Sequence, residues 1–254
     1  MWISLLERSF HGDGRSERGK MTTSYECVLC DREMRRFTTR GKCSYCGKEE
    51  ETDYICPNGH YICQDCRVAG AEEIIKKTCR ATKERDPVRL AVTLMRHPAV
   101  QMHGLEHHYL VACILLAVMR NSPKFSVTDS SFEEAVRRSR RLPLGSCGSM
   151  GVCGGAAGAG IALSIATGAT FTSDRERALC MRVVSRALDA IARIGGPRCC
   201  KASVLATLKV AAGLIGENFK VQIPISNWEG KCEFQKYNEK ECLREVCPYF
   251  RRTE

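Results

Sequence analysis

Long hydrophobic runs and a secretory signal are both missing from this 254-residue sequence. The apolar stretches at 110–119 and 156–166 are shorter than the roughly 18 residues that a membrane-spanning helix requires, so no membrane association is expected. Residues 1–20 hold no apolar segment of the kind that a secretory signal needs, and we expect a disordered leader there, with Met21 as an alternative start. The expected location is the cytoplasm, where disulfides are rare.

Cysteine is present in excess, at 17 of 254 residues or about 7%. In a compartment that keeps thiols reduced, so many cysteines are typical of metal ligands and catalytic thiols. The odd number agrees, because an odd number of cysteines cannot all pair in disulfides. Seven cysteines lie at regular spacing between 27 and 66, and the others are scattered from 79 to 247. The distribution divides the chain into a leader (1–20), a zinc-binding module (21–70), a helical linker (71–90), a helical domain (91–226) and a cysteine-containing tail (227–254).

Four ligand pairs follow one another in the zinc-binding module. Two Cys-x-x-Cys pairs, a Cys-x3-His pair and a last Cys-x-x-Cys pair supply enough ligands for two zinc ions. Each ion is bound either by two pairs that follow one another in the sequence or, as in a cross-brace, by alternate pairs. The last two pairs resemble the central stretch of RING fingers, but the other ligands depart from that order, so no ubiquitin-ligase activity is implied. The ligands are Cys27, Cys30, Cys43, Cys46, Cys56, His60, Cys63 and Cys66.

The metal in such a module has a structural role, because about 40 residues cannot build a sufficient core alone. Nucleic-acid binding is the alternative role, since five basic residues lie between or beside the first ligand pairs. An acidic run at 49–53 follows them and offsets their charge. The basic residues are Arg32, Arg35, Arg36, Arg40 and Lys42.

Apolar residues recur at intervals of three and four along most of the chain after Pro87, which predicts helices. Strand-like patterns are rare there, and 221–225 is the best candidate. The expected fold is therefore mainly α, with a helical C-terminal domain preceded by a small zinc-binding module of the ribbon or cross-brace type. The predicted helices lie at 88–95, 109–120, 132–138, 156–167, 174–194 and 200–216.

Two segments of the helical domain do not look like ordinary core. At 97–109, histidines and a glutamate open a helix, where they can bind metal, take protons or hold an anion. At 143–160, a glycine-rich loop leads into a helix of small residues, and its N–H groups can cradle a carboxylate or phosphate, although close helix packing alone explains the later glycines. The candidate catalytic residues are His103, Glu106, His107 and His108, and the candidate substrate-binding residues are Ser146, Gly148, Ser149 and Gly151.

A third segment, 197–201, places two adjacent cysteines between an arginine and a lysine at the start of a helix. This position favours a thiolate, as a metal ligand or a nucleophile requires. The tail adds three cysteines at ligand-like spacing, either for a third zinc or for a cluster. The thiols of these regions are Cys147, Cys153, Cys199 and Cys200, followed in the tail by Cys232, Cys242 and Cys247, while Cys79, Cys113 and Cys180 look like buried thiols.

The three segments, in this order, resemble elements of the iron–sulfur L-serine dehydratase α-chain and of L-cysteine desulfidases. They also resemble an uncharacterised cysteine-rich domain family of anaerobes and archaea, with the elements HGxEHH, GSCGxxGxCGG and PRCCK and no established activity. The first resemblance implies a [4Fe–4S] cluster with one open iron as Lewis acid, and a histidine as base. The implied candidate ligands are Cys147, Cys153, Cys199 and Cys200. The dehydratases have a further cysteine shortly before the last segment, and this sequence lacks it. Cys147, Cys113 or a cysteine of the tail would supply that ligand instead.

The function that this resemblance implies is a lyase-like or sulfur-handling enzyme that acts on a small carboxylate or thiol substrate. One alternative is a zinc-stabilised module that binds RNA or protein without catalysis. Another is a colourless enzyme that transfers groups through the thiol of Cys200.

Overall fold

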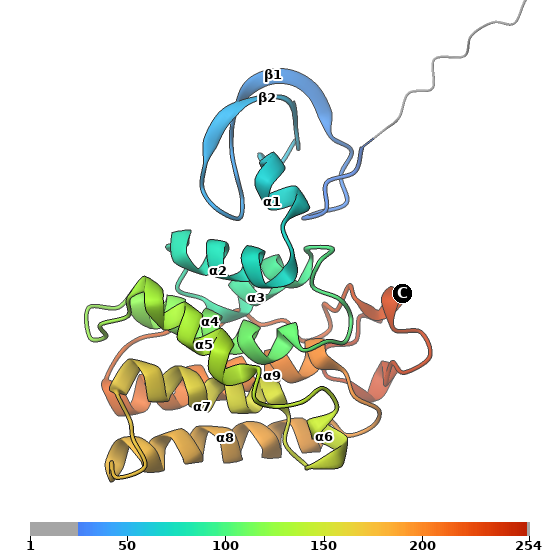
Figure 1. Ribbon diagram of the computed structural model, residues 1–254. Helices are drawn as coiled ribbons and strands as arrows, with labels where there is room; N and C mark the ends of the chain where they lie inside the picture. Colours follow the sequence, from blue (N-terminus) through green and yellow to red (C-terminus); the bar gives the residue numbers. More distant parts are fainter. Residues whose placement is uncertain (1–24, 253–254) are drawn as a thin grey trace, which may run out of the picture.

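The computed structural model describes residues 25–252, and helices dominate this part, as the sequence predicts. The expected leader and Met21 lie outside the described residues. A small module with a two-stranded hairpin stands on a stack of helices, and the tail runs along the side of the stack (Figure 1). The elements are β1 (Arg35–Lys42), β2 (Glu49–Ile55), α1 (Gln64–Val68), α2 (Ala71–Ala81), α3 (Pro87–Met95), α4 (Glu106–Arg120), α5 (Asp129–Ser139), α6 (Ser146–Ser149), α7 (Gly154–Thr167), α8 (Arg175–Ile194), α9 (Cys200–Phe219), η1 (Gln235–Tyr237) and η2 (Arg244–Val246).

Helix α4 is the centre of the helical body. Every residue from Glu106 to Met119 is buried, and a helix that is apolar on all sides belongs in the interior of a domain. Helices α2, α3, α5, α7 and α9 all pack against it. Within residues 25–252, no helix has both the length and the apolar character that crossing a bilayer requires.

Helices α4 and α7 approach each other at backbone distance because α7 begins with small residues. A Cβ at Gly158 would overlap the backbone carbonyl oxygen of His108, and a Cβ at Gly154 would overlap the imidazole ring of the same residue. Larger residues at these positions would push the two helices apart. The glycines therefore bring the start of α7 directly against the histidine-bearing start of α4.

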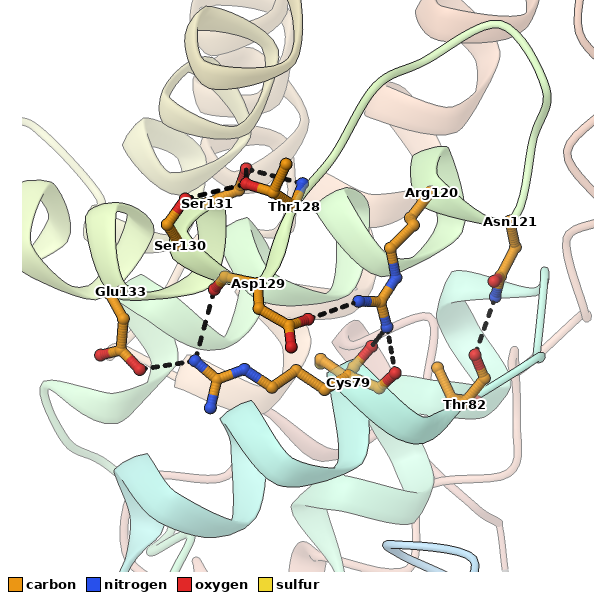
Figure 2. Close-up of polar contacts among 10 residues, drawn as sticks. Cys79, Thr82, Arg120, Asn121, Thr128, Asp129, Ser130, Ser131 and Glu133 are labelled. Atoms are coloured by element: carbon orange, nitrogen blue, oxygen red, sulfur yellow. Dashed lines mark hydrogen bonds and ion pairs between the residues drawn. The ribbon is translucent and has the colours of Figure 1, made fainter.

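Helix α2, expected to belong to a linker, packs into the helical body instead of bridging two parts. Arg120, at the end of α4, donates a hydrogen bond to the carbonyl of Cys79 at 3.0 Å and pairs with Asp129 at 2.9 Å. Asn121 donates to the carbonyl of Thr82 at 3.1 Å (Figure 2). These bonds satisfy carbonyl groups that the end of α2 would leave without partners.

The loop after α3 joins the zinc-binding module and the tail to the helices. The ring of Tyr45 meets the ring of His97 edge-on, with centroids 5.2 Å apart. His97 Nε2 lies 2.8 Å from the carbonyl oxygen of Cys66. The preceding residue, Arg96, forms a two-pronged ion pair with Glu233 of the tail, with N–O distances of 2.5 and 2.8 Å. Three parts of the chain thus meet at this loop.

The prediction of a strand at 221–225 is wrong. This segment is extended, but in the described part of the chain the only sheet consists of β1 and β2, which pair antiparallel between the ligand pairs of the module. No strand edge is available beside the helices for 221–225 to join. The sequence pattern did not reveal β1 and β2 because both are polar and largely exposed.

Replacing Gly158 with alanine should destabilise the protein, because the new methyl group meets a carbonyl that cannot rotate away. We expect Gly158→Ala to lower the free energy of unfolding by about 1–3 kcal/mol, the usual cost of overpacking, in urea denaturation of the metal-loaded protein. Gly213→Ala on α9 is the matched control. No atom lies within 4 Å of a Cβ there, so alanine should stabilise the helix by up to about 1 kcal/mol. Equal effects of the two changes would contradict the close contact.

Candidate metal centre and thiol-lined cavity

The eight predicted ligands of the zinc-binding module form two groups, and each group takes alternate pairs of the sequence. In both groups the ligand atoms all lie within 4.8 Å of one another, so each group could hold a metal ion. Of the two pairings that the sequence left open, the structure adopts the cross-brace. The first group is Cys27, Cys30, Cys56 and His60, and the second is Cys43, Cys46, Cys63 and Cys66.

The sulfur atoms within each group are spaced like ligands of one ion. The Sγ atoms of Cys30 and Cys56 lie 3.4 Å apart, and those of Cys46 and Cys63 lie 3.7 Å apart. Thiolates around a tetrahedral zinc, with bonds of about 2.3 Å, are about 3.8 Å from one another. Burial opposes ionisation of Cys30, but the N–H of Arg32 and the neighbouring ligands lower its pKa to about 6. A thiolate is therefore available there at neutral pH.

Double substitutions distinguish the two pairings. In the cross-brace, Cys30→Ala with Cys56→Ala disables one group, whereas Cys30→Ala with Cys46→Ala disables both. We expect the first variant to lose one zinc relative to the wild type and the second to lose two, counted per chain by atomic emission. The control is Cys180→Ala. Cys180 lies outside both groups, so this change should leave the zinc content unchanged. Loss of two ions from the first variant and one from the second would indicate sequential pairing.

The hairpin carries mixed charge. Its register places Arg40 opposite Glu51 and Lys42 opposite Glu49, and the Lys42 ammonium lies 3.4 Å from the Glu49 carboxylate. Opposite charges across a strand pair reduce the field that would attract a phosphate backbone. The alternative role in nucleic-acid binding therefore gains no support from this surface.

The three segments singled out in the helical domain meet at one cavity of about 310 Å³, which we call the α4–α9 cavity. It lies where α4, α7 and α9 begin and α8 ends, and Figure 1 shows the short helix α6 beside that end of α8. Residues far apart in the sequence thus share one space. Those with reactive side chains are His107, His108, Cys147, Cys153, Cys199 and Cys200.

Both histidines of this cavity are held in the neutral form. Burial, and then the charge of Lys201, lowers the pKa of His107 to about 3, and burial also lowers the pKa of His108. His107 Nδ1 lies 3.2 Å from the carbonyl oxygen of Gly104. His107 Nε2 is buried and has no hydrogen-bond partner within residues 25–252. The ring of His108 lies against Gly154 on one edge, and the backbone of Ser139 and Leu142 partly offsets the lowering of its pKa.

His103 and Glu106 lie outside the lining of the cavity. His103 Nε2 lies 3.0 Å from the side-chain oxygen of Asn238 and 3.4 Å from the carboxylate of Glu241, both in the tail. Glu106 folds back over Gly104, and its carboxylate lies 3.6 Å from His107 Nδ1. The structure thus places His103 as a contact between the segment before α4 and the tail, and Glu106 beside His107.

Three of the candidate iron–sulfur thiols face the same part of the cavity. Cys147 is exposed, and Cys153 and Cys200 are half-buried. Burial raises the pKa of Cys200 and the nearby sulfurs of Cys153 and Cys147 raise it further, while the N–H of Gly104 opposes this. The three sulfurs are therefore close enough for their charges to interact.

Several polar groups of the glycine-rich loop form hydrogen bonds within the loop itself. The N–H groups of Ser149 and Met150 bond to carbonyls of Gly145 and Ser146 at 3.1 and 2.9 Å. The Ser146 hydroxyl donates to the carbonyl of Val152 at 2.8 Å, and that of Ser149 to the carbonyl of Gly145 at 3.2 Å. Ser146 and Gly148 line the cavity, whereas Ser149 and Gly151 do not. These polar groups of the loop therefore stabilise its own turn.

Arg198 is a further candidate for binding an anion, a role that the sequence pattern did not indicate. It is exposed, lines the cavity, and makes no ion pair with any described residue. A guanidinium group binds a carboxylate through two parallel hydrogen bonds. The signal in the sequence was its position directly before the two cysteines of α9.

The remaining thiols separate into two kinds. The tail cysteines lie away from the α4–α9 cavity and surround a smaller one, which Cys199 also lines. Cys79 and Cys113 are fully buried, and burial raises the pKa of both. Cys180 is half-buried on α8. Cys79 and Cys113 match the expectation of buried thiols, whereas Cys180 is only partly buried.

The fold and its cavities define a helical domain with cysteine-lined sites, preceded by a module with two candidate metal centres. Residues 75–250 match a protein family described as a family of unknown function, DUF5714, and the chain belongs to this family. Neither a curated protein nor a solved structure matches the chain. The family match includes the α4–α9 cavity and the tail, while the metal ligands at 27–66 lie before it.

The neutral state of His107 should make the protein less stable in acid. The unfolded chain takes up a proton near pH 6.5, but the folded protein does so only near pH 3, so stability is lost as the pH falls below 6.5. One such group lowers the free energy of unfolding by about 2 kcal/mol between pH 7 and 5. In His107→Gln this contribution is absent, so urea denaturation should show a loss about 2 kcal/mol smaller than in the wild type. An equal loss in both proteins would contradict a neutral His107.

Proposed function

We propose that the α4–α9 cavity is the active site of an iron–sulfur-dependent enzyme. Its reaction is lyase-like or sulfur-handling, on a small carboxylate that bears a hydroxyl or thiol group. The observation that carries this proposal is the convergence of three thiols and two neutral histidines, from separate segments, on one cavity. Perturbed titratable groups gathered in a cleft are typical of functional sites.

The residues present fit a cluster with one open position. Cys147, Cys153 and Cys200 would supply three sulfurs, and the side chains of His107 and His108 line the same cavity. When bound, such a cluster supplies an iron that acts as a Lewis acid on the leaving group of the substrate. The half-buried position of two of the thiols limits access of water to the site.

We assign the base to His108 rather than to His107. A general base works best when its pKa is near the working pH, and the pKa of His107, about 3, is too low for this. His108 would take the proton from the α-carbon as the bond from the β-carbon to oxygen or sulfur breaks. The electron pair of the C–H bond becomes the new double bond, and the leaving group departs as hydroxide or hydrosulfide. Arg198 would hold the carboxylate in place.

The alternative of a thiol nucleophile is less favoured by the electrostatics. Burial and the neighbouring sulfurs raise the pKa of Cys200, so the thiol stays protonated unless a metal binds it. A nucleophilic cysteine requires the opposite shift. The non-catalytic alternative, a zinc-stabilised module that binds RNA or protein, does not account for the gathering of thiols and neutral histidines at one cavity.

Anaerobic reconstitution with iron and sulfide tests the proposal. We expect Cys147→Ala with Cys153→Ala to bind less iron and acid-labile sulfide than the wild type, and to lose formation of pyruvate from L-serine or L-cysteine. Cys180→Ala is the matched control, because its thiol is also half-buried but lies on α8 outside the cavity. This variant should keep both properties. Equal iron content in the wild type and the double variant would refute the proposal.

A further inference from the structure

A second large cavity lies where the zinc-binding module, the loop after α3 and the tail meet. Its volume of about 550 Å³ is within the range of small-molecule sites. The lining comes from residues of 26–31, 95–102 and 233–237 and from Lys201 of α9, and we call this space the junction cavity. All of its lining residues differ from those of the α4–α9 cavity, so the proposed active site does not account for it.

The wall of the junction cavity contains a buried cation. Lys201 is only 3% exposed, and its ammonium donates hydrogen bonds to the carbonyls of Met95 and Val100 at 3.2 and 2.9 Å. The same ammonium lies 5.1 Å from the centroid of the Phe234 ring. All three of these neighbours line the cavity. Because an ammonium group has three N–H donors, one donor is left without an acceptor in the described part of the chain.

The charge of Lys201 is not paired with a carboxylate. Among the described residues, no carboxylate lies within ion-pair distance of it, and Glu106, whose charge acts on it from farther away, does not line the cavity. Of the carboxylates that do line the cavity, Glu233 pairs with Arg96, and the two of the module are exposed. A buried charge without a partner is costly, and an anionic ligand would supply that partner.

Apolar side chains surround the ammonium. Leu29, Met95, Val100 and Phe234 line the junction cavity, and each is at most 4% exposed. Met102 also lines it, and methionine adapts its shape to what it contacts. Apolar walls around one polar group are typical of sites for ligands with an apolar body and one polar end. In surroundings of this kind an ionic hydrogen bond is stronger than in water.

A carboxylate fits this site better than a phosphate does. A phosphate monoester carries a charge of about −1.5 to −2 at neutral pH, whereas a carboxylate carries a single charge that one ammonium can balance. In the described part of the chain, the other lining cation without a carboxylate partner is Lys236, which is exposed. The buried end of the cavity therefore offers one positive charge.

We infer that the junction cavity binds a monocarboxylate with an apolar body, and that the carboxylate accepts a hydrogen bond from the Lys201 ammonium. The ligand contacts the module, the loop after α3 and the tail at once, so its binding fastens the three parts together. Adjacent residues of α9 then serve different sites, with Cys200 in the α4–α9 cavity and Lys201 in the junction cavity. This site goes beyond the proposed function, and neither depends on the other.

Titration of the full, zinc-loaded chain with octanoate, followed by calorimetry, tests the inference. We expect one octanoate to bind per chain, and 1-octanol, which has the same body without the charge, to bind at least about tenfold more weakly. Lys201→Met keeps the apolar bulk of the side chain and should weaken octanoate binding at least about tenfold. Lys209→Met is the matched control, because Lys209 is an exposed lysine of the same helix outside the cavity, and it should match the wild type.

A further variant separates this site from the proposed active site. Arg198→Met removes the carboxylate-binding group proposed for the α4–α9 cavity and should leave octanoate binding unchanged. Weaker octanoate binding in Lys201→Met alone supports the inference. Loss of octanoate binding in Arg198→Met instead, unchanged binding in Lys201→Met, equal affinity for 1-octanol, or no saturable binding by the wild type overturns it.

Far-UV circular dichroism and the zinc content report whether Lys201→Met folds. If it does not, Val28→Glu decides. Val28 lines the junction cavity from the module and is 41% exposed, so the fold tolerates a change there, and the new carboxylate repels an anionic ligand. Weaker octanoate binding in this variant supports the inference, and unchanged binding overturns it.

Discussion

The backbone contact between α4 and α7 is the constraint on which the rest of the helical body depends. Without side chains at Gly154 and Gly158, the start of α7 rests on the carbonyl and ring of His108. This contact sets the orientation of the imidazole and also places Cys153, the residue before α7, beside it. A helix as apolar as α4 needs neighbours on every side, and the glycines allow α7 to be one of them at backbone distance.

Burial determines the charges at both cavities. His107 and His108 are kept neutral, and the thiols that lack a metal are kept protonated, because the surroundings penalise ions. Lys201 is the exception, since it remains a polar head within a lining that is mostly apolar and its pKa falls only to about 8. A metal or cluster bound to these thiols would therefore displace their protons.

Much of this arrangement could be predicted from the sequence. Ligand spacing identified all eight residues of the two groups that could hold a metal ion, and three unusual segments identified the parts that meet at the α4–α9 cavity. The pairing of the ligands could not be predicted, because both pairings use the same turns. The separation of His103 from His107 could not be predicted either, because it depends on the residue at which α4 starts. The hydrogen bonds within the 143–153 loop depend on the geometry of its turn. The grouping of Cys199 with the tail depends on how distant segments fold back, which local periodicity does not report.

The adjacent cysteines at the start of α9 also constrain how this chain can vary in evolution. Each residue added or removed at the helix start would rotate the following side chains by about 100° around the axis. A one-residue insertion between Cys199 and Cys200 would therefore change the direction of one thiol relative to the other, so that the pair could no longer line both cavities. Insertions and deletions, which loops usually tolerate, should be selected against at this junction even where the neighbouring loops differ in length.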